Sequence, residues 1–362
     1  MKPLIIGDLT AKIPVIQGGM GVGISLSRLA GNVAACGGIG VISTAQIGFR
    51  DTEFERNPLK ANLKAIGEEI RKAKEIARGG IIGVNIMVAT KKYEEYVKTA
   101  VKAGVDIIIS GAGLPVDLPK LTEGSKTKIA PIVSTVKSAK VLCKMWDRHY
   151  QKVPDLVVIE GPKAGGHLGF SREQLSQFCD IENQDIDKEN ISKKVDYDSE
   201  IRGIIQVVKE YEEKYNKKIP VVVGGGIFNK KDVCHAMELG ADGVQMGTRF
   251  VTTYECDADD RYKQTYLDAR KEDIVIVNSP VGMPGRAIRN KFILNKEKEK
   301  KPVKKCYQCI KGCNPMETPY CITRALINAA VGKVEEALLF CGENAWKCTK
   351  IEHVKDILEE IS

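Results

Sequence analysis

Four cysteines lie close together in the sequence with a spacing that is typical of metal sites. They follow the pattern Cys306-x2-Cys309-x3-Cys313-x7-Cys321. Two intervening residues allow both sulfur atoms of a C-x2-C pair to face one metal centre. The pattern therefore predicts a metal site, for which a [4Fe–4S] cluster and a zinc ion are both candidates. The alternative is a set of four reduced cysteines that pack a small subdomain.

A candidate catalytic residue is His167, one of only four histidines in the chain. It follows two glycines, so its ring would have room beside a bound ligand. Histidine has an ordinary pKa of about 6.5 and can act as an acid or a base near neutral pH. The alternative is a loop histidine that bonds to a backbone carbonyl group. The other three histidines fall on predicted helices, and we assign them to that second class.

Two glycine-rich segments are candidates for holding a phosphate group. Residues 224–226 are three consecutive glycines before a predicted helix, and Gly247-Thr248 follows the next apolar segment. Exposed backbone N–H groups in such turns bind phosphate. In (β/α)8 barrels a phosphate is frequently held after the seventh and eighth strands. The alternative is that these glycines serve only as turn residues.

The elements that must position these residues are short apolar segments rich in Val and Ile, which predict strands buried on both faces. Their starts are mostly 23 to 28 residues apart, the length of one strand and one helix. Predicted helices between them, such as 93–104 and 232–240, end at glycine. The eight predicted strands are residues 13–17, 39–43, 81–87, 105–110, 129–134, 156–160, 220–224 and 243–247.

Eight such units predict an α/β fold, namely a (β/α)8 TIM barrel over residues 1–250. A doubly wound sheet is the alternative, although the glycines of residues 18–23 do not have the G-x-G-x-x-G spacing. The alternation of strands and helices stops near residue 250. We predict that residues 251–362 form a smaller, mostly helical subdomain that covers the barrel mouth. It would contain the cysteine cluster at 306–321 and a C-terminal helix over 353–361.

The composition is that of an ordinary globular protein. The chain has 362 residues, 43% of them hydrophobic, and 55 basic against 47 acidic residues. Seven lysines lie between Lys291 and Lys305, but such a run usually forms a solvated loop, so we predict no nucleic-acid partner. The sequence shows no signal-peptide pattern and no membrane-spanning run. We therefore expect a cytoplasmic protein that acts on a small molecule; a homodimer is compatible with the sequence.

The motifs together resemble the nitronate monooxygenase (2-nitropropane dioxygenase) family. This is a family of FMN-dependent TIM barrels that includes the FabK-type enoyl-acyl-carrier-protein reductases. The resemblance spans roughly residues 10–290 and rests on six segments that occur in the same order. They are IPVIQGGM, GVNIM, SGAG, EGPKAGGHLG, PVVVGGGI and GVQMGTRF.

The resemblance implies a catalytic role for His167 and an FMN site built from strand ends. The segments at 18–20 and Asn85 would lie along the isoalloxazine ring, Glu160 would approach its middle, and the later glycines would hold its phosphate. The implied FMN-binding residues are Gly18, Gly19, Met20, Asn85, Glu160, Gly161, Gly225, Gly226, Gln245, Gly247 and Thr248. The segment 180–199 departs from the simpler family pattern and is expected over the flavin face.

Two reactions are compatible with this resemblance. The leading hypothesis is the oxidation of alkyl nitronates with dioxygen, in which no nicotinamide is required and His167 accepts a proton or bonds to the nitro oxygens. The alternative is an NAD(P)H-dependent reductase of an enoyl thioester, another activated alkene or a quinone. An iron–sulfur cluster would favour the reductase. A third hypothesis, from a different class, is a non-enzymatic flavin or metal sensor.

Overall fold

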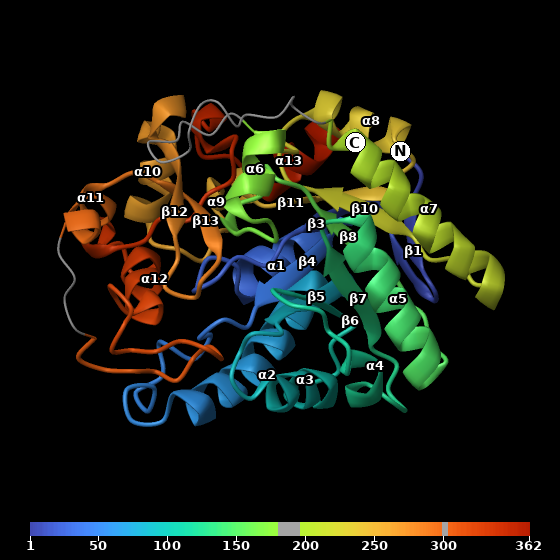
Figure 1. The fold of residues 1–362 in the computed structure, drawn as a ribbon, viewed down its shortest axis with the longest axis horizontal. Coiled ribbons are helices and arrows are strands. Elements are labelled where there is room, and N and C mark those ends of the chain that lie inside the picture. The colour runs from blue at the N-terminus through green and yellow to red at the C-terminus, as the bar shows by residue number, and fades with distance from the viewer. Residues whose placement is uncertain (180–195, 299–302) are drawn as a thin grey trace.

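The computed structural model describes residues 1–179, 196–298 and 303–362, and its central feature is a closed barrel of eight parallel strands (Figure 1). Around the barrel the order is β10-β11-β3-β4-β5-β6-β7-β8. The ring closes between β10 and β8, where Gly224 is paired with Glu160. The strands are β3 (Val15–Gln17), β4 (Ile39–Ser43), β5 (Ile81–Met87), β6 (Ile107–Gly111), β7 (Lys128–Val133), β8 (Val157–Glu160), β10 (Val221–Gly224) and β11 (Gly243–Met246).

All eight predicted strands are present, and the barrel prediction is confirmed. Strand β4 shows why apolar segments form the barrel strands. All five of its residues are buried, because its side chains face the barrel interior on one side and helices on the other. Side chains such as Val41, Ile109 and Val158 fill the interior. A short antiparallel hairpin, β1 (Leu4–Ile6) and β2 (Leu9–Ala11), packs its buried residues into the same interior cluster.

Helices surround the barrel (Figure 1). The predicted glycine stops are confirmed: α3 and α8 are followed by Gly104 at φ +72° and Gly240 at φ +102°. The C-terminal helix α13 (Val354–Ile361) contacts α1 and α8 and belongs to the barrel's hydrophobic cluster, although the sequence placed it with the subdomain. The other helices of this layer are α1 (Ser27–Ala35), α2 (Pro58–Ala77), α3 (Tyr93–Lys102), α4 (Leu118–Leu121), α5 (Val136–Tyr150), α7 (Asp198–Tyr215) and α8 (Lys230–Glu238).

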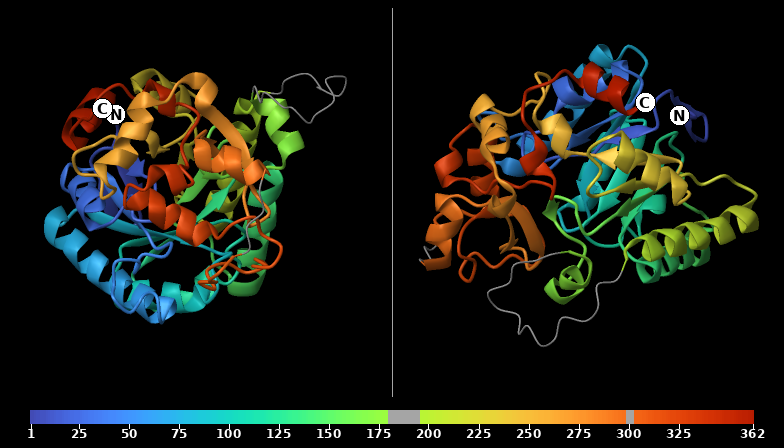
Figure 2. Two further views of the ribbon diagram at one scale, coloured as in Figure 1. Left: turned by 90° about the vertical axis from the view of Figure 1, so that its left-hand side faces the viewer. Right: turned by 90° about the horizontal axis from the view of Figure 1, so that it is seen from above.

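The C-terminal part of the chain lies over one end of the barrel (Figure 2). Its helices are α10 (Asp260–Asp268), α11 (Lys291–Lys298) and α12 (Ile322–Ala330). It also contains a sheet that the sequence did not predict, made of β12 (Ile274–Asn278), β13 (Pro284–Ile288) and β9 (Gly166–His167). The sequence does not reveal this sheet because its middle strand, PGRAI, has no strand-like alternation and finds its second partner, β9, in a barrel loop.

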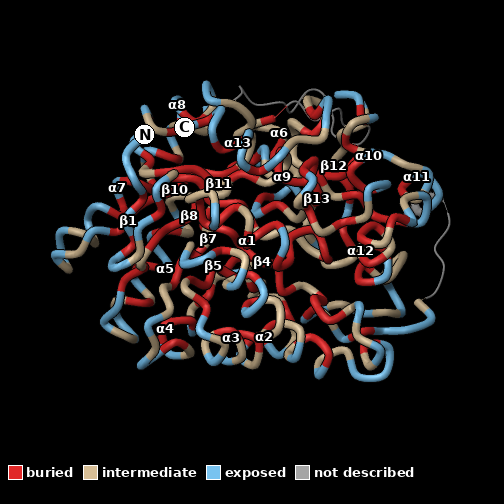
Figure 3. Tube along the Cα trace, turned by 180° about the vertical axis from the view of Figure 1, so that it is seen from behind, coloured by how far each residue is buried: buried red, intermediate tan, exposed pale blue. Residues whose placement is uncertain are grey.

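Buried residues are concentrated along the barrel strands and continue into the C-terminal part (Figure 3). Two further short helices are α6 (Arg172–Phe178), which follows β9, and α9 (Thr248–Val251), which follows barrel strand β11. The segment 180–199, which was expected over the flavin face, falls largely on residues 180–195, which lie outside the described residues. Among the residues that are described, no helix combines the length and the apolar composition that crossing a membrane requires.

Candidate functional site

A cavity of about 470 Å³ opens at the carboxyl ends of the barrel strands, which is a typical size for a small-molecule or cofactor site. All eight strands contribute to its wall through the residues that end or follow them. The barrel-side lining includes Gly18, Gly19, Met20, Ser43, Asn85, Met87, Gly111, Ser134, Glu160, His167, Gly225, Gly226, Gln245, Gly247 and Thr248.

The C-terminal part supplies the opposite wall of the same cavity. Its contribution is mainly apolar and aromatic, with a polar segment at residues 342–344. The lining residues from this part are Tyr262, Tyr266, Met283, Cys309, Ile310, Ile322, Thr323, Leu326, Phe340, Cys341, Gly342, Glu343 and Asn344. Residues of the C-terminal part and of the barrel strand ends thus face one another across a single cavity.

At one end of the cavity, four backbone N–H groups form a candidate phosphate site. The N–H groups of Gly225, Gly226, Gly247 and Thr248 donate no hydrogen bond to another described residue. Gly225 has φ +97°, and a Cβ atom there would lie 2.8 Å from the carbonyl oxygen of Gly161. Only glycine fits at that position without strain, and free N–H groups beside such a turn suit an anion.

The C-terminal segment completes this end of the cavity. The side-chain amide of Asn344 donates to the carbonyl oxygen of Gly226 at 2.7 Å, and the N–H of Glu343 donates to that of Lys163 at 3.2 Å. A Cβ atom at Gly342 would lie 2.4 Å from Oγ1 of Thr248. Sequence analysis missed this segment, and its only local sign was a glycine between polar residues.

Asn85, at the end of β5, and the glycine-rich segment after β3 form another part of the cavity wall. A Cβ atom at Gly19 would lie only 2.4 Å from the Cβ atom of Asn85. The side-chain amide of Asn85 donates to the carbonyl oxygen of Ile109 at 3.3 Å, which fixes its orientation. The segment itself is held by Ser25, whose hydroxyl oxygen accepts from the N–H of Met20 at 2.8 Å. Gly19 therefore packs directly against the side chain of Asn85, and only glycine fits there without strain.

His167 lies in β9 and is held by the C-terminal sheet. It is paired with Gly285 of β13, and its Nε2 atom lies 2.7 Å from Oγ of Ser279. The ring also packs edge-on against Phe340, with ring centroids 5.0 Å apart. Burial lowers the pKa of His167 to about 4, because the charged ring would lose its hydration there. The ring is therefore neutral at pH 7.

Glu160, at the end of β8, is the second titratable group of the cavity wall. Burial raises the pKa of its carboxyl group to about 7, and a hydrogen bond from the backbone of Gly169 offsets this only in part. The hydroxyl group of Tyr197 donates to the carbonyl oxygens of Ser134 at 2.7 Å and Glu160 at 3.2 Å, which fixes the local backbone. The cavity thus contains a neutral histidine and a carboxyl group that is half-protonated near neutral pH.

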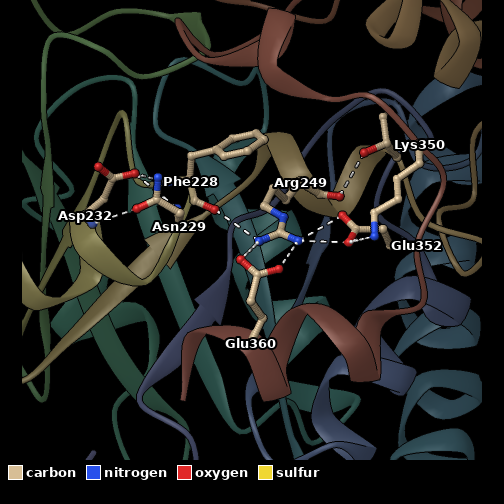
Figure 4. A network of polar contacts seen from close by, with 8 residues as sticks. Phe228, Asn229, Asp232, Arg249, Lys350, Glu352 and Glu360 are labelled. Carbon is tan, nitrogen blue, oxygen red and sulfur yellow. Dashed lines mark hydrogen bonds and ion pairs between the residues drawn. The ribbon is translucent and has the colours of Figure 1, made fainter.

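A network around Arg249 ties the C-terminal helix to the segment that follows β11 (Figure 4). Its guanidinium group contacts both oxygens of Glu352 at 2.9 to 3.0 Å and both oxygens of Glu360 at 2.8 to 2.9 Å. Arg249 directly follows Thr248 of the candidate phosphate site. Sequence analysis did not single out this arginine, whose role depends on partners more than 100 residues away.

The predicted site residues converge in space. His167 and ten of the eleven predicted FMN-binding residues line the cavity, and Gly161 lies directly behind Gly225. Cys309 also lines the cavity, while Cys306 is exposed at the surface. The predicted metal site is not formed as arranged: in the described part of the chain, no three His, Cys, Asp or Glu side chains are grouped so that they could hold a metal ion.

Comparison with known proteins identifies relatives for this arrangement. A family model described as nitronate monooxygenase matches residues 2–362. A probable nitronate monooxygenase from Staphylococcus saprophyticus is 26% identical over 309 residues, which cover 80% of this chain and 79% of that protein. One from Staphylococcus haemolyticus is 25% identical over 311 residues, covering 79% and 78%.

Solved structures share the fold over nearly the whole chain. FabK from Thermotoga maritima superposes with a TM-score of 0.68 at 24% identity, covering 97% of this chain and 92% of that one. A nitroalkane oxidase from Streptomyces ansochromogenes superposes with a TM-score of 0.70 at 18% identity, covering 96% and 94%. At these identities, the structural likeness establishes the barrel and its C-terminal cover.

Proposed function

The chain belongs to the nitronate monooxygenase family and is a flavin-dependent oxidoreductase, and on this premise we propose that it binds FMN and oxidises alkyl nitronates with dioxygen. The observation that carries the proposal is the position of His167. Its neutral ring lines the same cavity as the free N–H groups of Gly225 and Gly226. A ligand held by its phosphate at those glycines would extend along the cavity wall that includes the histidine.

The described residues fit FMN. The free N–H groups at 225–226 and 247–248 suit its phosphate, and the glycine at position 19, with no side chain to stand out beside Asn85, would leave room for its ring system. Bound FMN supplies the redox chemistry, because it can take electrons from the nitronate and pass them to dioxygen. The protein supplies binding, orientation and electrostatics. The carboxyl group of Glu160, with its pKa of about 7, can hold or release a proton beside the ring system.

His167 is placed to orient the substrate. Its ring is held on one side by Ser279 and packed by Phe340, so it presents a fixed polar edge in a mainly apolar part of the cavity. A nitronate carries its negative charge on two oxygens, and a neutral imidazole N–H can donate a hydrogen bond to one of them. Such preorganised donors in a buried site are worth far more than they are in water.

The alternative is an NAD(P)H-dependent reductase of an enoyl thioester or a quinone. The observation in its favour is the apolar wall formed by Ile310, Ile322 and Leu326, which would suit an acyl chain. In that reaction, His167 would donate a hydrogen bond to the thioester carbonyl oxygen, and the bound flavin would supply the reducing equivalents. The two proposals use the same pocket and differ in the electron donor.

An anaerobic experiment decides between them. The purified protein, once bound FMN has been verified by extraction, is mixed with NADH or NADPH while the absorbance of the oxidised flavin is followed. The nitronate proposal predicts no rapid bleaching with either nucleotide, and turnover of propyl nitronate in air. Rapid bleaching would favour the reductase. A protein that cannot take up FMN would contradict both proposals.

A metal at Cys306, Cys309, Cys313 and Cys321 stays a prediction. The thiols as arranged do not form a site for a [4Fe–4S] cluster or zinc, so no step of the proposed reaction uses one. Metal analysis of the purified protein tests the prediction, with Cys313→Ser beside it. One equivalent of zinc, or four of iron, that is lost in the variant would confirm it, and metal-free protein would refute it.

A further inference from the structure

The ring of His167 shares a hydrogen bond with the side chain of Ser279, which lies 112 positions further along the chain. Ser279 follows β12 and begins the turn that leads into β13, the strand that pairs with His167. Its backbone is fixed, because its N–H donates to the carbonyl oxygen of Met283 at 3.1 Å and its carbonyl oxygen accepts from Gly282 at 3.0 Å. Ser279 is buried, with 6% of its surface exposed.

The hydrogen bonds of the Ser279 hydroxyl group indicate its direction of donation. The oxygen accepts a hydrogen bond from the N–H of Val281 at 3.4 Å. A hydroxyl group has one proton to donate. Among the described residues, the hydrogen-bond partner of this hydroxyl group that can accept the proton is Nε2 of His167, at 2.7 Å. A neutral imidazole that accepts at Nε2 must carry its proton on Nδ1. Within the described residues, Nδ1 of His167 makes no hydrogen bond.

We propose that Ser279 is a positioning residue that holds His167 in the Nδ1–H form, so that this N–H donates to an oxygen atom of an anionic substrate. The inference rests on the proposed function and names the residue that sets the hydrogen-bond donor for its anionic substrate. A nitronate arrives already deprotonated and needs only the donor. A neutral nitroalkane would first have to lose a proton to a base, and an imidazole with a pKa of about 4 is a weak base at neutral pH.

The surroundings of His167 support a neutral ring. Burial is the cause of its lowered pKa, and no charged side chain contributes to the shift. The contacts on its ring come from Ser279 and from Phe340. Among the described residues no carboxylate contacts the ring, although Glu160 and Glu343 line the same cavity, and the serine is the group that decides which nitrogen carries the proton.

The test uses the holoenzyme with 15N-labelled histidine. The chain has four histidines, so His167→Gln identifies the signals of residue 167. The wild-type ring should show the pattern of a neutral imidazole protonated at Nδ1, down to about pH 5. Ser279→Ala should lose this preference, and Ser279→Thr should restore it. The matched control is Ser125→Ala, whose hydroxyl group bonds to the carbonyl oxygen of Thr122 away from the cavity and whose loss should change nothing.

Activity provides the second measurement. For Ser279→Ala we expect kcat/KM for propyl nitronate to fall about tenfold, as the loss of one orienting hydrogen bond predicts, and Ser279→Thr to recover most of it. The wild type should oxidise the nitronate and leave the neutral nitroalkane unchanged. A proton on Nε2 in the wild type, or an unchanged ring pattern in Ser279→Ala, would overturn the inference even if nitronate is oxidised. If the ring is protonated at Nδ1 as expected but neither the nitronate nor the nitroalkane is turned over, the role of Ser279 toward His167 stands and the proposed function is refuted.

Discussion

Arg286 in β13 donates a hydrogen bond of 2.9 Å to the carbonyl oxygen of Pro162, in the loop that follows barrel strand β8. The same guanidinium group donates to the carbonyl oxygen of Ala164 and lies 3.4 Å from the carboxylate of Glu343. One buried side chain thus joins the C-terminal sheet, the loop that leads to His167 and the segment that closes the cavity. The loop that leads to His167 is therefore held from outside the barrel.

Replacing Arg286 with methionine should destabilise the protein. Two carbonyl groups would lose their donor in a buried setting, and we expect the free energy of unfolding to fall by about 3 kcal/mol. FMN retention should fall with it, since the loop lies against Gly225. Urea unfolding and flavin extraction measure both effects. Arg71→Met is the control, because it removes an exposed helical ion pair with Glu75. Equal losses in the two variants would show that Arg286 does not organise the loop.

Replacing Gly225 with alanine should weaken FMN binding. The new Cβ atom would meet the carbonyl oxygen of Gly161 at 2.8 Å, and the backbone conformation at φ +97° disfavours any side chain. Gly67→Ala is the matched control, since a Cβ atom there has nothing within 4 Å and lies inside helix α2. The control should gain about 0.5–1 kcal/mol of stability and keep its FMN. Stoichiometric FMN in the Gly225 variant would show that the phosphate lies elsewhere.

The buried carboxyl group of Glu160 should make stability depend on pH. Its pKa is about 7 in the folded protein and near 4.5 when unfolded, so the folded state holds the proton more tightly. The stabilisation is present below pH 4.5 and is lost as the pH rises to 7. Relative to Glu160→Gln, the free energy of unfolding of the wild type should therefore fall by on the order of 3 kcal/mol between pH 4.5 and 7. Urea unfolding at several pH values measures this difference.

Comparing the wild type with Glu160→Gln also removes the contribution of His167 to the pH dependence of stability. Its pKa is lowered to about 4, so its contribution to stability is lost as the pH falls from about 6.5, which is the opposite slope. Both proteins carry this histidine, and its contribution cancels in the difference. A difference between wild type and Glu160→Gln that does not change with pH would mean that Glu160 is ionised in the folded protein.

The two carboxylates at Arg249 should differ in their contribution to stability. Glu352 is 12% exposed and Glu360 is 51% exposed, although both contact the same guanidinium group. We expect Glu352→Gln to cost about 3 kcal/mol, because it leaves a buried charge with a single exposed partner. Glu360→Gln should cost less than about 1 kcal/mol. Thermal unfolding of the two variants tests the order, and a larger loss for Glu360 would reverse this assignment.

The barrel and its strand ends could be predicted because their signals are local. Runs such as IIGVNIM are apolar on both faces, which predicts a covered parallel strand, and glycines after helices α3 and α8 set the length of each unit. Since parallel strands in a barrel end on the same side, residues as distant as Gly19, Asn85 and Gly225 had to meet at one mouth. The position of His167 beside them followed from the same rule.

Tertiary structure alone decided what holds these residues in place. Ser279 reaches His167 across 112 positions, and Asn344 reaches Gly226 across 118, so no window of sequence contains either pair. The sheet of β9, β12 and β13 could not be foreseen, because a two-residue strand in a barrel loop has no periodicity of its own. The cysteines are the opposite case. Their spacing in the sequence predicts a metal site, but the described part of the fold does not bring three ligands together. Local patterns determined the barrel, whereas long-range packing determined the geometry and protonation of its site.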